Sequence, residues 1–423
     1  SRGLGDVYKR QSAESFSSIL CLMDYSEKEM LVGTDNGVYL FDRERKTFRR
    51  GDSPFGLWTL SDPTVHAMMW DNEGTLWVMT NSGGINYMSK QSKRFSTYSL
   101  SLTGMEKADR GIGPFCEDRE KNVWVGTRNG LWFFNSQTHS FYEYSLKKSN
   151  IRYDVRSLLL EGDNLWVGTY AEGLHVLNLK TGNIKSYTYS RNIPNTLCSN
   201  DVLSLFKDRK GEIFIGTSWG LCRYNPQSDN FITVINVGAM ASVTDIYEDM
   251  YNNLWIATSN RGVFCYNTVG EEWKHFEHIR EDLTTITSNS VITLFEDRKG
   301  TMWFGTNGGG LCSFSKETET FVDFDPENVW LPDKVIYSIE QDQAGNFWIS
   351  CNSGLYQFNP TDKNKNRLFT INDGLQGNQF TAQSSLASST GKLYFGGVNG
   401  FNVFEPKEFA DNTYPVSYTH LTL

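Results

Sequence analysis

Short hydrophobic runs separated by polar turns recur along the chain. Residues 213–217 read Ile-Phe-Ile-Gly-Thr, residues 165–169 read Leu-Trp-Val-Gly-Thr, and residues 123–127 read Val-Trp-Val-Gly-Thr. Runs of this length, rich in β-branched and aromatic residues and bounded by Gly, Asn and Asp, are typical of buried β-strands. Each run is followed by a turn glycine and then by a segment that ends in an aromatic residue. The pattern therefore predicts an all-β chain of short strands joined by tight turns.

The same phrase occurs nine times, and its turn glycine marks each copy. Successive turn glycines lie 42 to 48 residues apart. A glycine at a repeated turn position is expected where the backbone needs a positive φ. The period indicates a repeat architecture in which each unit is one small sheet. The nine glycines are Gly37, Gly84, Gly130, Gly173, Gly220, Gly262, Gly310, Gly354 and Gly400.

One repeat contains four predicted strands, which we call a to d. In residues 201–234, strand a is expected at 201–206, strand b at 212–217, strand c at 221–225 and strand d at 231–234. Asp and Gly between strands a and b supply hairpin geometry. Four antiparallel strands per repeat and a period near 45 residues predict the blades of a β-propeller.

Strand b carries a large ring in eight of the nine copies and, in most copies, a small residue two places later. The ring can fill the wedge between neighbouring blades, and the small residue lets a neighbouring backbone approach closely. We therefore expect the blades to stack and to bury one another's faces. The rings are Trp77, Trp124, Trp166, Phe214, Trp255, Trp303, Trp348 and Tyr394.

Composition narrows the functional classes. The net charge is −9, and no long Lys/Arg run occurs, so nucleic acid and anionic membrane surfaces are poor partners. The six histidines have no metal-ligand spacing, and no nucleophile–base motif or phosphate loop is present, so we expect no metal, cofactor or catalytic residue. The seven cysteines form no disulfide framework and are expected to be buried small hydrophobes.

The consensus Leu-Trp-Val-Gly-Thr-x-x-Gly-Leu-x-x-Tyr-Asn resembles the two-component-regulator propeller repeat of hybrid two-component sensors. The resemblance covers roughly residues 16–410. Residues 373–380 and 391–406 resemble the final blade of that family, which precedes a small β-sandwich, a membrane span and a histidine kinase. The resemblance implies that this chain is the periplasmic sensor ectodomain of an inner-membrane receptor. It also implies that the full-length protein is a homodimer, and that its membrane contact is made only through a C-terminal span that this sequence lacks.

The family commonly has two seven-bladed propellers in tandem, which implies a division of this chain. Residues 101–410 would form a complete seven-bladed propeller, and residues 12–100 the last two blades of a preceding one. The repeats alone equally permit nine blades in one array. Residues 1–11 and the end of segment 411–423 lack the repeat pattern and resemble translated adapter sequence, so we expect the natural protein to continue in both directions.

The turns between strands b and c, the b–c turns, vary between copies, whereas most of the repeat does not. In a propeller they share one face with the connections from strand d to the next strand a. Flat rings and Asn or Arg side chains at these turns are suited to sugar faces and hydroxyl groups. Turn closure and packing on a neighbouring blade are the structural alternatives for each residue. The candidate ligand-binding residues are Arg128, Tyr170, Trp219, Arg261, Asn307, Trp330 and Asn352.

Three functions follow as hypotheses. The first is a non-enzymatic sensor ectodomain that binds an oligosaccharide and signals to a histidine kinase outside this sequence. The second is a propeller lyase or glycosidase, which would need clustered His, Asp or Glu on the variable loops. The third is a protein-binding scaffold, although the Gly-His and Trp-Asp markers of WD-type repeats are missing from the sequence.

Overall fold

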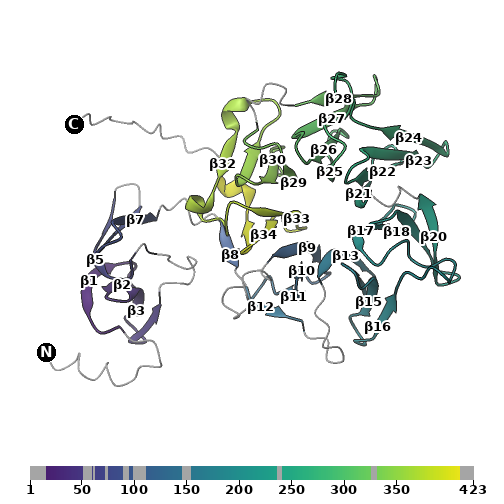
Figure 1. Ribbon diagram of the computed structural model, residues 1–423. Coiled ribbons are helices and arrows are strands. Elements are labelled where there is room, and N and C mark those ends of the chain that lie inside the picture. The colour runs from purple at the N-terminus through teal and green to yellow at the C-terminus, as the bar shows by residue number, and fades with distance from the viewer. Residues whose placement is uncertain are drawn as a thin grey trace. The chain divides into compact units, whose positions relative to one another are not determined.

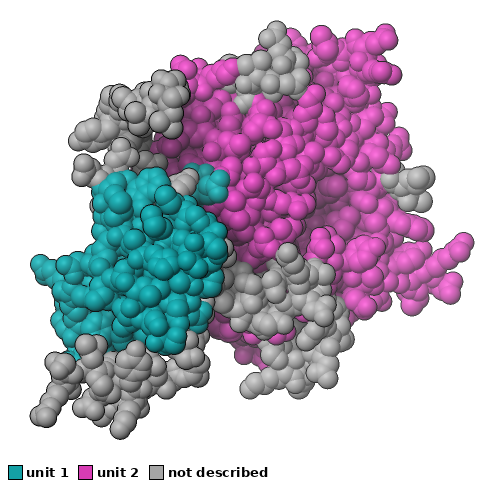
Figure 2. Space-filling model, turned by 60° about the vertical axis from the view of Figure 1, so that its left-hand side comes forward, with its two compact units in different colours: residues 1–97, 372–374 teal, residues 98–371, 375–423 magenta. Residues whose placement is uncertain are grey.

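The computed structural model describes residues 16–50, 60, 62–71, 75–88, 95–98, 111–144, 154–235, 241–324 and 331–409. These residues fall into two compact units, shown in different colours in Figure 2. The first unit comprises residues 1–97 with 372–374, and the second comprises residues 98–371 with 375–423. The expected division lay at residues 100/101, within a segment outside the described residues.

Seven four-stranded antiparallel sheets are arranged around one axis (Figure 1). They belong to the second unit, except that Ser96 and Thr97 of one outer strand are grouped with the first. We number them blade 1 to blade 7 in chain order. Their strands are β9 (Ile112–Glu117), β10 (Val123–Thr127), β11 (Gly130–Phe134), β12 (Phe141–Glu143), β13 (Val155–Glu161), β14 (Asn164–Thr169), β15 (Leu174–Asn178), β16 (Ile184–Tyr187), β17 (Val202–Lys207), β18 (Ile213–Thr217), β19 (Leu221–Asn225), β20 (Asn230–Ile235), β21 (Val243–Glu248), β22 (Asn253–Thr258), β23 (Val263–Asn267), β24 (Glu272–Phe276), β25 (Val291–Glu296), β26 (Met302–Thr306), β27 (Leu311–Ser315), β28 (Thr320–Asp323), β29 (Ile336–Gln341), β30 (Phe347–Cys351), β31 (Leu355–Phe358), β32 (Arg367–Phe369), β33 (Phe380–Ala387), β34 (Leu393–Gly397) and β35 (Gly400–Phe404), with β8 (Ser96–Tyr98).

The first unit contains two sheets. Trp77 is 37% exposed there, although its equivalents in the second unit are buried. No further sheet follows it among the described residues of this unit, so the apolar face of β6 that carries Trp77 and Met79 stays open to solvent. The strands are β1 (Ile19–Asp24), β2 (Glu29–Thr34), β3 (Gly37–Asp42), β4 (Thr47–Arg50), β5 (Val65–Trp70), β6 (Leu76–Thr80) and β7 (Ile85–Met88).

The prediction of an all-β propeller with nine repeats, seven of them in one propeller, is confirmed. Among the described residues the sheet of β5 to β7 has three strands rather than the predicted four. The described helical segments are the short 3-10 turns η5 (Lys363–Lys365), η6 (Ile371–Asp373) and η7 (Pro406–Phe409). Within the described ranges, no helix has the length and apolar character needed to cross a membrane.

Strand b lies between neighbouring blades, and this position explains its sequence. All five residues of β10, β18 and β26 are buried, because the adjacent blades cover both faces of the strand. Alternation between polar and apolar residues is therefore absent, and the strand reads as a continuous hydrophobic run.

The ring of strand b packs forward on the next blade. Trp166 of blade 2 contacts Tyr224 of blade 3 edge to face, with ring centroids 5.0 Å apart. Trp255 of blade 4 meets Phe304 and Phe314 of blade 5 in the same way, at 5.3 and 5.0 Å. The predicted wedge packing between blades is thus confirmed, and each such ring adds stacking energy to its buried area.

The small residue of strand b is needed for the approach of the next blade. A Cβ atom placed on Gly168 would come within 2.6 Å of Cγ1 of Val202, at the start of the next strand a. The same contact recurs between Gly305 and Ile336, at 2.7 Å. These distances are too short for nonbonded carbon atoms, so a larger residue would push the blades apart.

Blade 7 closes the propeller on blade 1. Tyr394 of β34 and Phe115 of β9 have ring centroids 6.0 Å apart and belong to one hydrophobic cluster. The outermost strand of blade 7 is β8, which precedes blade 1 in the chain. Its Tyr98 ring lies 4.7 Å from the Phe134 ring of blade 1 and 5.0 Å from the Phe401 ring of blade 7. Both ends of the second unit are therefore joined in one blade.

The acidic hairpins between strands a and b have a structural role. In blade 4, Oδ1 of Asp249 accepts hydrogen bonds from the backbone N–H groups of Tyr251 and Asn253, both at 2.9 Å. Its Oδ2 accepts from Nε1 of Trp255 at 2.8 Å. Equivalent indole bonds join Trp303 to Asp297 at 3.1 Å and Trp348 to Asp342 at 3.0 Å. The carboxylates thus close their turns, as the repeat position predicted.

The centre of the propeller is crossed by a side chain. Gln383, at a positive φ of 55° in β33 of blade 7, donates hydrogen bonds from Nε2 to the carbonyl oxygens of Thr244 in blade 4 and Ile292 in blade 5. The bond to Ile292 is 3.1 Å long. An inner strand of one blade is therefore tied to the inner strands of two blades on the other side of the axis.

One cysteine prediction is wrong. Cys198 and Cys222 form a disulfide that links the connection between blades 2 and 3 to strand β19. Sequence spacing did not reveal the pair because the two residues come together only when the connection folds back on blade 3. Cys265, Cys312 and Cys351 are free and buried, as expected for small hydrophobes.

The carboxyl group of Asp245 makes the stability of the second unit depend on pH. Asp245, on β21, accepts hydrogen bonds from the backbone N–H groups of Ile246 at 2.9 Å and of Leu294 in blade 5 at 2.8 Å. Burial raises the pKa of this carboxyl group to about 7, from about 3.9 in an unfolded chain. Between these two pH values the folded state keeps a proton that the unfolded state has lost.

We therefore expect the free energy of unfolding to fall as pH rises from about 4 to 7, with Asp245 contributing about 1–3 kcal/mol of the decrease. Urea unfolding at several pH values should give a flatter profile for Asp245→Asn, which has no carboxyl group to titrate. The half-buried Glu340, whose pKa desolvation also raises to about 7, is present in both proteins, so the difference isolates Asp245. Parallel profiles would contradict the assignment.

Candidate functional site

Each b–c turn in blades 1 to 5 is fastened by the threonine that ends strand b. In blade 3, Oγ1 of the fully buried Thr217 donates to the carbonyl oxygen of Gly220 at 2.9 Å and accepts from the backbone N–H of Trp219 at 3.2 Å. In blade 6, Sγ of Cys351 makes the equivalent bond to Gly354 at 3.2 Å. A side chain that replaces backbone partners in this way stiffens the turn. The other bonds join Thr127 to Gly130, Thr169 to Gly173, Thr258 to Gly262 and Thr306 to Gly310.

The b–c turns lie against the connections that lead to the next blade. The backbone N–H of Gly173 donates to the carbonyl oxygen of Asn200 at 2.9 Å, and that of Gly262 donates to Asn289 at 2.8 Å. In blade 5, Gly308 donates to Lys334 at 2.9 Å. Turns and connections thus share one face of the second unit, which we call the b–c face. Residues on it are held by a rigid scaffold, as binding residues on loops commonly are.

The two predicted aromatic residues are exposed on this face. Tyr170 is 53% exposed, and the Arg156 guanidinium lies 5.6 Å from the centroid of its ring. Trp219 is 49% exposed, and its ring lies 6.3 Å from that of Tyr189, at an interplanar angle of 45°. Neither ring is buried in its blade, so much of each remains available to a ligand.

The two predicted arginines lie on the b–c turns of blades 1 and 4. Arg128 is exposed, and its backbone N–H donates to the carbonyl oxygen of Gly111 at 3.3 Å. Nε of Arg261 lies 3.8 Å from a carboxylate oxygen of Glu277, and both side chains are 47% exposed. An ion pair this exposed is worth little, so the guanidinium can exchange it for another acceptor.

The predicted asparagines follow strand b in blades 5 and 6. Asn307 is exposed, and its backbone N–H donates to Ser290 at 2.8 Å. Asn352 is also exposed, and its Oδ1 accepts a hydrogen bond of 2.7 Å from the hydroxyl group of Tyr337. Burial raises the pKa of that hydroxyl group, which favours its role as a donor. Trp330, the remaining candidate, lies outside the described residues.

The structure therefore places six predicted residues on the b–c turns of six successive blades. Tyr189 was not among the predicted ligand-binding residues. It lies on the connection between blades 2 and 3, beside Trp219. An aromatic residue on a connection could have been considered as a candidate, because the connections were expected on the same face as the b–c turns. The threonine that ends strand b also recurs in the sequence, but its hydrogen bond to the turn became apparent only in the structure.

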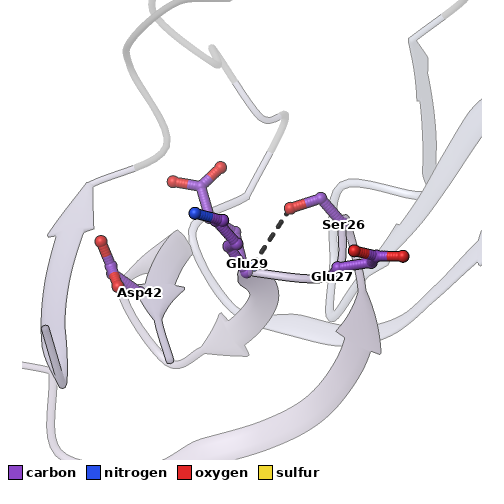
Figure 3. Close-up of a pocket in the computed structure, with 5 residues that line it drawn as sticks. Ser26, Glu27, Glu29 and Asp42 are labelled. Carbon is purple, nitrogen blue, oxygen red and sulfur yellow. Dashed lines mark hydrogen bonds between the residues drawn. The ribbon is translucent and has the colours of Figure 1, made fainter. Parts of the chain in front are cut away.

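We also searched the part of the chain that the structure describes for metal sites and pockets outside the b–c face. No group of three or more His, Cys, Asp and Glu side chains there is suited to hold a metal ion. A shallow hollow in the first unit is lined by Ser26, Glu27, Lys28, Glu29 and Asp42 (Figure 3). Oγ of Ser26 accepts a hydrogen bond from the backbone N–H of Glu29 at 3.1 Å, which closes the hairpin between β1 and β2. This hollow is a feature of a turn rather than of the b–c face.

Comparison with known proteins identifies the repeat. Residues 239–260, 285–308 and 331–353 match the model of the two component regulator propeller family. A curated relative, Histidine kinase P4 of Formosa agariphila, is 23% identical over 343 residues, which are 78% of this chain and 25% of the relative. The chain thus spans about a quarter of that protein.

Solved structures share the fold. The extracellular domain of BT3049 from B. thetaiotaomicron, assigned to a hybrid two component system, is 24% identical with a TM-score of 0.71, covering 93% of this chain and 52% of that one. PorZ of the type-IX secretion system of Porphyromonas gingivalis is 15% identical with a TM-score of 0.56, covering 92% and 62%. Virginiamycin B lyase from Staphylococcus aureus is 14% identical with a TM-score of 0.55, covering 73% and 98%.

At these identities the solved structures establish architecture rather than activity. The matches to the family model fall on three consecutive repeats of the second unit. The chain is a β-propeller protein, and three of its consecutive repeats match the two component regulator propeller model.

Proposed function

We propose that this chain is part of the ectodomain of a two-component sensor and that its b–c face binds an oligosaccharide without cleaving it. The observation that carries the proposal is the exposure of Tyr170 and Trp219, at 53% and 49%, on turns that buried threonines hold in place. An exposed ring on a rigid turn offers flat apolar contact to sugar C–H groups, and the Asn and Arg side chains of other blades can satisfy hydroxyl groups.

The cellular setting belongs to the same proposal. The disulfide between Cys198 and Cys222 supports an oxidising compartment such as the periplasm. The relatives named for a histidine kinase and a hybrid system support a receptor whose kinase lies outside this sequence. In that receptor, ligand binding would rearrange a homodimer, and the two sheets of the first unit would belong to a preceding propeller.

The binding residues can be tested by calorimetry. We expect Trp219→Ala to weaken oligosaccharide binding by about 1–3 kcal/mol, because an exposed ring at the centre of a binding surface is a typical hot spot. Trp273→Ala is the matched control, since Trp273 is 41% exposed on the outer strand β24, away from the b–c turns. The titrations would use oligosaccharides that wild-type protein retains on a glycan array.

Three results would contradict the proposal. Unchanged affinity in both Trp219→Ala and Tyr170→Ala would place the site away from the b–c turns. Release of shortened sugars during incubation would favour the alternative of a propeller lyase or glycosidase. Binding of a protein partner with no binding on the glycan array would favour the scaffold alternative.

A further inference from the structure

Among the described residues, the b–c face exposes three aromatic rings around one connection. The connection between blades 2 and 3 presents Tyr189, which is 37% exposed, and the turns on either side present Tyr170 and Trp219. Three exposed rings on neighbouring segments are unusual for a surface with no partner, because each contributes apolar area to water. We call these three residues the aromatic cluster.

One carboxylate joins the segments that carry the cluster. Oδ1 of Asp201 accepts a hydrogen bond of 2.9 Å from the backbone N–H of Ala171, next to Tyr170. Its Oδ2 accepts one of 3.0 Å from the hydroxyl group of Ser218, next to Trp219. Both turns are therefore fixed to the same side chain, and the rings beside them are held at a defined separation.

A covalent bond holds the third ring. The backbone N–H of Tyr189 donates to Oδ1 of Asn200 at 2.7 Å, which closes the connection on itself. Two residues before Asn200, Cys198 is joined to Cys222 in β19. The disulfide thus attaches the connection to the blade that carries Trp219, and Tyr189 is held beside that ring at 6.3 Å.

The connection between blades 4 and 5 shows what is specific to this place. It has the same backbone arrangement, since the N–H of His278 donates to Oδ1 of Asn289 at 2.7 Å and the N–H of Ile279 donates to Oγ1 of Thr285 at 3.1 Å. In that connection Thr287 stands where Cys198 stands, facing the free Cys312. The disulfide therefore occurs where the aromatic cluster occurs and is not required by the loop conformation itself.

The charges around the cluster indicate the class of ligand. The Arg156 guanidinium beside Tyr170 already pairs with the Asp154 carboxylate at 2.6 Å. The carboxylate of Asp201 is occupied by the two turns, and the exposed Glu172 and Arg191 have opposite signs. The net charge of −9 on the chain disfavours a polyanion.

We propose that Tyr170, Tyr189 and Trp219 form one binding subsite for the faces of consecutive rings of a neutral oligosaccharide, and that Asp201 and the Cys198–Cys222 disulfide are its positioning residues. This inference rests on the proposed oligosaccharide-binding function. It adds a contact residue, Tyr189, and a ligand class, and it predicts binding that changes little with salt concentration because no ion pair is formed.

The test uses the whole chain and four oligosaccharide probes: neutral β-glucan, β-galactan and α-arabinan oligosaccharides, and acidic alginate oligosaccharides. We expect wild-type protein to bind a neutral probe, and Tyr189→Ala to weaken that binding about tenfold. Tyr189→Phe should retain the affinity, because it keeps the ring. His278→Ala, the change at the same place in the other connection, should leave affinity within about twofold.

A double-mutant cycle separates positioning from general structural support. Cys198→Thr reproduces the residue found at position 287 and should weaken binding several-fold in otherwise wild-type protein. In the Tyr189→Ala background the same change should have a much smaller effect, because the disulfide acts through that ring. A purely structural role would give equal losses in both backgrounds.

The outcomes distinguish this inference from the proposed function. If wild-type protein binds none of the four probes, both fail. If it binds a neutral probe but Tyr189→Ala binds as tightly as wild type while Asn352→Ala loses affinity, the proposed function stands and the subsite is refuted. Preference for the alginate probe, or strong weakening of binding by salt, would refute the neutral ligand class.

Discussion

Trp166→Ala will lower the free energy of unfolding of the second unit by about 3–5 kcal/mol. The indole of Trp166 is 5% exposed and packs with Leu197, Val202 and Phe231 in one cluster that joins blades 2 and 3. Truncation removes this ring from the wedge between the blades, and strands on either side cannot close the gap without shifting the whole sheet. Urea unfolding followed by circular dichroism measures the loss.

Trp219→Ala is the matched control for that experiment. It removes the same side chain, but Trp219 is 49% exposed at the b–c turn. We expect its unfolding free energy to stay within about 0.5 kcal/mol of wild type, as is usual for a surface change. Similar losses in the two variants would contradict the assignment of strand b to the interior and of the b–c turn to the surface.

Gly262→Ala will lower the unfolding free energy by about 2–5 kcal/mol. Gly262 has a φ of +60°, and a Cβ atom there would overlap the carbonyl oxygen of Phe276. The left-handed conformation costs a non-glycine residue about 1–2 kcal/mol, and overpacking adds about 1–3 kcal/mol. The neighbouring oxygen is a backbone atom of strand β24, so it cannot move away by a side-chain rotation.

Gly308→Ala is the control that separates the cost of the steric contact at Gly262 from the cost of the positive φ angle. Gly308 has a φ of +91°, its b–c turn also donates a backbone hydrogen bond to the following connection, and no heavy atom lies within 4 Å of the Cβ position. We expect a loss of about 1–2 kcal/mol there. If thermal and urea unfolding show equal losses for the two glycine variants, backbone contact at Gly262 is not the cause.

Much of the candidate site could be predicted because it depends on the repeat. A residue that follows strand b by one or two positions lies on the b–c turn in every blade, so Arg128, Tyr170 and Trp219 could be placed without coordinates. Their contacts could not. Tyr189 reaches Trp219 only through a connection whose path the repeat pattern does not describe.

The same division applies to the buried tryptophans. An Asp six residues before Trp255 or Trp303 is visible in the sequence, and in both cases it accepts the indole hydrogen bond. Trp166 has Leu160 at that position, and its Nε1 atom is buried without a hydrogen-bond partner. The local sequence does not decide this by itself, because Trp124 has Asp118 at that position and its Nε1 atom is also buried without a hydrogen-bond partner.

By itself, the sequence determined the strands, the turns and the stacking of blades, since each depends on residues within one repeat and on the fit of a ring beside a small residue. The tertiary structure decided which distant segments meet. Tyr98 joins the last blade beside Phe401, Gln383 reaches Thr244 across the axis, and Cys198 bonds to Cys222. The first two contacts exist because closing a propeller brings together segments that are far apart in the chain. The third exists because the connection between blades 2 and 3 folds back on blade 3, and the proposed aromatic subsite is a consequence of that fold.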